Sequence, residues 1–78
     1  MSTHATVKRT EAVMQWLHDN PGYHQPQEVA RGLQISTHQA AATCIHLAQQ
    51  GRIERLREAG RPRSVYRWDP YKPLPFTT

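Results

Sequence analysis

The sequence predicts an α+β fold in which three short helices are followed by a two-stranded β-hairpin. Up to Gly51, apolar residues recur three and four positions apart, as in helices that bury one side. Beyond Gly51 the spacing changes to two, which is typical of strands. A chain of 78 residues has room for one domain. We expect a flexible arm over residues 1–6, the folded domain over 7–68 and a proline-rich extended tail over 69–78.

The first predicted helix covers residues 7–18. Its apolar stripe consists of Val13, Trp16 and Leu17. Residues 19–22 end it, because their proline disfavours the helical conformation in the residue before it and their glycine turns the chain.

The second predicted helix begins at Pro26, since the first helical position loses nothing by lacking an N–H group. Gln25 would be its cap, an unusual choice of residue. Val29 and Leu33 supply the buried side, and Gly32 weakens the helix near its end.

The third predicted helix, residues 36–50, has the clearest boundaries. Ser36 and Gln39 match a capping box, and Gly51 suits a left-handed C-terminal cap. Ile45 has two interpretations: it packs on the helix over residues 7–18, or it belongs to a dimer patch. The expected buried edge has a spacing of four and three and consists of Ala40, Cys44 and Leu47.

The hairpin is predicted from two alternating segments, residues 53–58 and 64–68. Between them, residues 59–63 have the composition of a turn and carry two arginines, so the hairpin has a basic tip. Tyr23 and His24 are compatible with a further short extended piece.

Positive charge is concentrated on this hairpin. The chain has ten basic and six acidic residues, a net charge of +4 and a pI of about 9.8. Arginine clustered on one element is typical of nucleic-acid binders. Six of the ten basic residues lie in the hairpin region, and all are arginine: Arg52, Arg55, Arg57, Arg61, Arg63 and Arg67.

The ordered set of elements resembles the winged helix-turn-helix fold of small bacterial transcriptional regulators. More narrowly, it is similar to the short regulators of fimbrial phase variation, which share the length, a Gln-Ala pair early in the third helix and an arginine-glycine wing. The resemblance covers residues 10–68. It is carried by residues 13–17, 27–33, 35–36, 47–53 and 66–68.

The resemblance implies sequence-specific binding of double-stranded DNA, with the helix over residues 36–50 in the major groove and the wing over 53–68 on the backbone or minor groove. Gln39 would pair with adenine, and Ala41 or Ala42 would touch a thymine methyl group. The full set of expected base-contacting residues is Thr37, His38, Gln39, Ala41, Ala42, Thr43 and His46. The expected backbone or minor-groove contacts are Lys8, Arg9, Arg31, Arg55, Arg57, Arg61, Arg63 and Arg67.

The tip of the hairpin has a second resemblance. Gly60-Arg61-Pro62-Arg63 is similar to the Gly-Arg-Pro core of AT-hook segments, which implies that Arg61 and Arg63 enter a narrow A·T minor groove. The alternative is an ordinary solvated turn whose arginines touch phosphates or nothing.

Other classes of protein find little support in the sequence. The single cysteine and the five histidines have no paired zinc-ligand spacing, so Cys44 is expected in the core and no metal or other cofactor is expected. There is no carboxylate pair, glycine-rich phosphate loop or placed nucleophile, so we expect no enzyme and no small-molecule substrate. No apolar run approaches the roughly 18 residues of a membrane span. We therefore expect a cytoplasmic protein that does not bind membranes.

Three alternatives remain open at this point. The domain can be a winged-helix protein–protein interaction module of a larger complex rather than a DNA binder. The neutral face of the third helix can be merely solvated. A homodimer or a complex with a partner regulator is compatible both with DNA binding and with protein interaction. The tail can be disordered, a strap over the core or a partner-binding segment.

Overall fold

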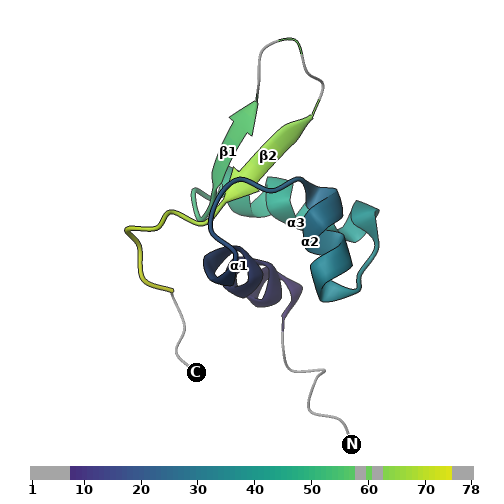
Figure 1. The fold of residues 1–78 in the computed structure, drawn as a ribbon, viewed down its shortest axis with the longest axis horizontal. Coiled ribbons are helices and arrows are strands. Elements are labelled where there is room, and N and C mark those ends of the chain that lie inside the picture. Colours follow the sequence, from purple (N-terminus) through teal and green to yellow (C-terminus); the bar gives the residue numbers. More distant parts are fainter. Residues whose placement is uncertain (1–7, 58–59, 61–62, 75–78) are drawn as a thin grey trace, which may run out of the picture.

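The computed structural model describes residues 8–57, 60 and 63–74. Three helices, α1 (Arg9–Asp19), α2 (Pro26–Leu33) and α3 (Thr37–Gln49), precede two strands, β1 (Glu54–Arg57) and β2 (Ser64–Arg67). The strands pair antiparallel and project from the helices as a wing (Figure 1). The α+β fold class predicted from the sequence, three helices followed by a two-stranded hairpin in the layout of a winged helix, is confirmed.

The ends of α1 differ from the prediction by one or two residues. The helix begins at Arg9, because the Lys8 carbonyl accepts the first helical hydrogen bond, from the Ala12 N–H at 3.0 Å. It ends after Asp19, where the Asn20 side-chain amide donates to the Trp16 carbonyl at 2.8 Å. The Trp16 carbonyl thus accepts both the backbone N–H and the side-chain amide of Asn20, which holds this residue at the end of the helix.

Helix α2 begins at Pro26 as predicted, with Gln25 at the cap. Glu28 stabilises this N-terminus, because its carboxylate accepts the Gln25 backbone N–H at 2.8 Å. At the other end, Gln34 has the left-handed conformation, with a φ of 58°, and the next N–H returns to the Ala30 carbonyl at 3.0 Å. This tight reversal brings the chain directly into the cap of α3.

Helix α3 has the predicted caps. The Ser36 hydroxyl accepts the Gln39 N–H at 3.0 Å, and the Gln39 side-chain oxygen accepts the Ser36 N–H at 3.2 Å. Gly51, with a φ of 74°, reverses the chain after the helix. The predicted buried edge is confirmed, because Ala40, Cys44 and Leu47 are all fully buried.

The core is formed where the three helices meet the base of the wing. Trp16 packs half-buried against it, and Leu33, Ile35 and Leu74 cover its other sides. The buried apolar residues come from the three helices, from β2 and from the segments after α3 and β2: Val13, Met14, Leu17, Val29, Ala30, Ala40, Cys44, Leu47, Ile53, Tyr66 and Trp68.

The segment between α1 and α2 joins the sheet at one point. His24 and Tyr66 exchange two backbone hydrogen bonds, each of 2.8 Å, in an antiparallel bridge. The short extended piece suggested by the sequence is therefore one bridged residue, and it fixes the base of the wing to the helical part.

Residues 69–74 fold back over the core. A turn closes where the Lys72 N–H meets the Asp69 carbonyl at 3.1 Å, and the Trp68 indole N–H donates to the Lys72 carbonyl at 2.9 Å. Leu74 then packs against the core. This part of the tail is a strap with a turn rather than an extended segment, because an indole N–H and an apolar side chain hold it in place. The arm over residues 1–6 and the end of the tail over 75–78 lie outside the described residues.

Within the described ranges, no helix is both long enough and apolar enough to cross a membrane.

Candidate nucleic-acid interface

Helix α3 turns one side to solvent, and that side carries no charge. His38, Ala42 and His46 are exposed there, as expected for base-contacting residues, and Thr37 is exposed at its start. Ala41 is half-buried at the border with the wing. Gln39 is half-buried as well, so six of the seven predicted base-contacting residues are at least partly exposed.

Thr43 is not accessible. Its side chain is 7% exposed, and its hydroxyl donates to the Gln39 carbonyl at 2.9 Å. The prediction that Thr43 contacts a base is wrong. Its position could have excluded it, because it lies three residues after Ala40 and four before Leu47, on the buried side of the helix.

Gln39 has a structural role that conflicts with the predicted contact to adenine. A bidentate pair with adenine uses both the oxygen and the nitrogen of the side-chain amide. In this structure the oxygen already accepts the Ser36 N–H in the capping box. Gln39 therefore belongs to the N-terminal capping box of α3, and in this conformation its side chain is not free for the predicted bidentate contact with adenine.

Ile45 is the accessible residue whose place the sequence left open. It is 38% exposed and does not belong to the apolar residues packed on the core, so it does not pack on α1. It follows Thr37 and Ala41 at intervals of four, and the three form a line along the helix that faces the wing. This four-residue spacing is the sequence signal that could have placed Ile45 on the side of α3 that faces the wing.

An open groove of about 390 Å³ runs between α3, the start of α2 and the wing. Among its described lining residues, two are arginines and none is acidic. The lining residues are Gln25, Pro26 and Gln27 before and in α2, Thr37, Ala41 and Ile45 in α3, and Arg55, Arg63, Ser64 and Tyr66 in the wing.

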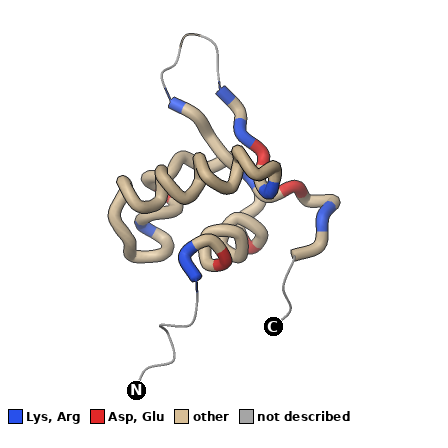
Figure 2. The backbone as a smooth tube through the Cα atoms, turned by 180° about the vertical axis from the view of Figure 1, so that it is seen from behind, with Lys and Arg blue, Asp and Glu red and all other residues tan. Residues whose placement is uncertain are grey.

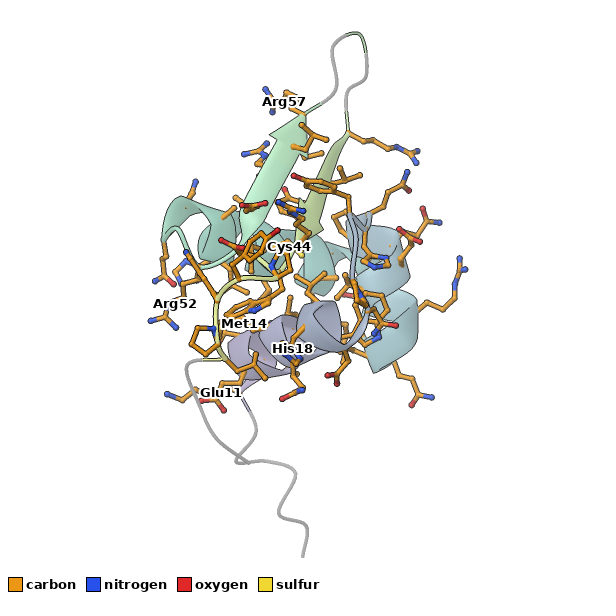
Figure 3. All side chains as sticks on the ribbon, turned by 60° about the vertical axis from the view of Figure 1, so that its left-hand side comes forward. Glu11, Met14, His18, Cys44, Arg52 and Arg57 are labelled. Atoms are coloured by element: carbon orange, nitrogen blue, oxygen red, sulfur yellow. The ribbon has the colours of Figure 1, made fainter. Side chains whose placement is uncertain are left out.

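The register of the wing decides which arginines face this groove. Arg55 is opposite Tyr66, and Arg57 is opposite Ser64, so all four share the face turned toward α3. Ser64 also accepts a hydrogen bond from the Arg55 Nε at 2.9 Å, which fixes the direction of that guanidinium. Arg57 lies at the outer end of β1 (Figure 3).

Arg67 lies on the other face of the wing. It is opposite Glu54, with which it forms an ion pair, and its guanidinium carbon is 5.0 Å from the centre of the Tyr23 ring. The hydrogen bond to Glu54 raises the pKa of Arg67. Arg67 is therefore paired and faces away from the groove, unlike Arg55 and Arg63, and its contact with DNA stays a prediction.

The remaining predicted backbone contacts are scattered. Lys8 and Arg9 are exposed at the start of α1, at the end of the molecule opposite the wing (Figure 2). Arg31 is exposed in the last turn of α2. Arg63 is exposed next to the groove, whereas Arg61 and Pro62 of the proposed minor-groove tip lie outside the described residues.

Cys44 is a core residue, pointing into the molecule between α3 and α1 (Figure 3). Burial raises the pKa of its thiol to about 11, so the group is neutral near pH 7. In the part of the chain that the structure describes, no three His, Cys, Asp or Glu side chains come together in a way that could hold a metal ion.

Comparison of the chain with protein-family models, with curated proteins and with solved structures found no match.

Proposed function

We propose that this protein binds double-stranded DNA in a sequence-specific manner, as a small transcriptional regulator of winged-helix type. The observation that carries the proposal is the composition of the groove. An exposed, uncharged helix face and two arginines of the wing border the same opening, and the described lining residues include no acidic group. Such a surface suits a polyanion that also presents apolar and polar edges.

Dimensions and side-chain size support α3 as the helix that enters the major groove. An α-helix with its side chains is about 10–12 Å wide, and the major groove of B-DNA is about 12 Å wide. Ala41 and Ala42 are small, so the helix axis can come close to the base edges. Thr37 and His38 stand at the N-terminal end of α3, the end that contacts bases in helix-turn-helix complexes.

The wing supplies the phosphate contacts. Arg55 and Arg63 border the groove, and Arg57 extends the same face outward. Helix α3 itself offers no basic side chain apart from its histidines, so the backbone must be held by neighbouring elements. Arginine is suited to this because its guanidinium pairs with phosphate through two donors.

The test is binding of a fluorescent 20-base-pair duplex of random sequence across a salt series. With about four to six phosphate contacts, log affinity should fall against log salt with a slope of roughly −4 to −5. An excess of unlabelled duplex should compete, and an excess of a neutral polymer should not. Absence of binding at low salt, or a flat salt response, would overturn the proposal in favour of a protein-interaction module.

A further inference from the structure

We propose that α3 selects its DNA site through the methyl groups of thymine, with Ile45 as the principal contact and Ala41 and Ala42 beside it. The inference rests on the proposed DNA binding and specifies what the helix recognises there. The thymine methyl is the one apolar group that a base presents in the major groove.

The polar groups available for reading bases on α3 are few. The most common specific contact, arginine or lysine to guanine, has no donor here, because residues 32–51 contain neither. The Gln39 oxygen and the Thr43 hydroxyl are engaged in hydrogen bonds within the helix and its cap. His38, His46 and Gln49 remain exposed, next to an apolar strip.

That strip is formed by Ala41, Ala42 and Ile45. Ile45 is 38% exposed and, with Ala41, lines the groove that Arg55 and Arg63 border on the wing side. A single exposed isoleucine is ordinary on a protein surface. Ile45, however, lines the same groove as two arginines suited to phosphates, so a DNA base edge is what would cover it in the complex. Of the groups on a base edge, the thymine methyl is the one that gains from apolar contact.

The wing offers a matched control for this residue. Leu56 is 42% exposed, has the same number of carbon atoms as Ile45 and lies opposite Val65. Alternation along β1 places it on the face away from Arg55 and therefore away from the groove. Removing its side chain should leave base recognition unchanged.

The experiment uses the full chain and DNA in which thymine is replaced by deoxyuridine, which lacks only the methyl group. A preferred duplex is first enriched from a random library, and each thymine is then replaced singly. We expect an affinity loss of about fourfold at one or more positions, the effect of one buried methyl group. Affinity is measured by fluorescence anisotropy.

Ile45→Ala should remove the difference between thymine and deoxyuridine at one of these positions. Leu56→Ala should retain the full difference, which also separates the protein contact from any change in the DNA itself. Thermal melting checks that Ile45→Ala folds, and Ile45→Val, with one carbon atom fewer, should give an intermediate discrimination.

The outcomes separate this inference from the proposed function. A preferred duplex that binds equally well with deoxyuridine at every position overturns the methyl contact and leaves specific DNA binding standing. If Ile45→Ala still distinguishes thymine from deoxyuridine at every position where the parent protein does, the role of Ile45 is overturned. Absence of DNA binding, or failure of the library to enrich any sequence, overturns specific DNA recognition and the inference together.

Discussion

Trp16 and Gly32 show how one residue without a side chain allows α1 and α2 to pack. A Cβ atom added at Gly32 would lie 2.6 Å from Cε2 and 2.9 Å from Cζ2 of the Trp16 indole, and still closer to its nitrogen. The Trp16 and His24 rings also pack in an edge-to-face arrangement, with 4.8 Å between their centroids. From the sequence, Gly32 is a residue that weakens a helix, whereas in the structure it makes room for the tryptophan.

Gly32→Ala should therefore destabilise the protein, although alanine favours a helix by about 1 kcal/mol over glycine. Overpacking against the indole should lower the free energy of unfolding by about 1–3 kcal/mol, measured by urea denaturation. The control is the same substitution in a Trp16→Ala background, where the space is free and alanine should stabilise. A stabilising effect in the parent protein as well would contradict the close packing.

At the scale of the element, the two faces of the wing distinguish its arginines. Arg55 borders the groove, whereas Arg67 is paired with Glu54 on the opposite face. If the wing holds the DNA backbone from the groove side, substitution of Arg55 should remove a phosphate contact and substitution of Arg67 should not.

Arg55→Ala is expected to weaken binding to duplex DNA and to reduce the magnitude of the salt slope by about 0.9, the contribution of one phosphate contact. Arg67→Ala is the matched control, an arginine of the same strand pair, and should leave the slope unchanged. Both variants are measured by fluorescence anisotropy across the salt series. Equal reductions in the two variants would show that the wing contacts DNA without a preferred face.

The elements themselves could be predicted from the sequence because their signals are local. The capping box of Ser36 and Gln39 and the left-handed Gly51 lie within a few residues of the ends they set. The roles of two side chains could not be predicted in the same way. The sequence predicts for Gln39 both a cap and a base contact, which need the same oxygen. The pairing of Arg67 with Glu54 depends on the strand register, which residues far from Arg67 in the sequence decide.

At the scale of the whole molecule, the strap completes a small core. A chain of 78 residues buries a modest fraction of its surface, so each apolar contact matters to stability. Leu74 packs against the core from beyond the last strand, and the Trp68 indole anchors the turn before it. The sequence left the tail open, since three prolines and few apolar residues favour no regular element.

Leu74→Ala should lower the free energy of unfolding by about 1 kcal/mol, because a half-buried leucine loses part of the apolar contact that a fully buried one would. The control is Tyr71→Ala in the same segment, where the side chain is 92% exposed and the change should stay within about 0.5 kcal/mol. Urea denaturation of both variants decides this. Equal, negligible effects would mean that the strap does not contribute to the fold.

The backbone bridge between His24 and Tyr66 also sets a gradient of rigidity along the wing. An isolated two-stranded hairpin is marginal in water, and among the described residues this one has a third partner, His24, at its base. Amide hydrogens at the bridge should exchange with solvent only when the helical part opens, whereas those of the outermost pair, Arg57 and Ser64, should exchange through local fraying. A surface that contacts the wing thus meets a preorganised base, where little ordering entropy is lost, and an outer end that adapts its shape to the partner.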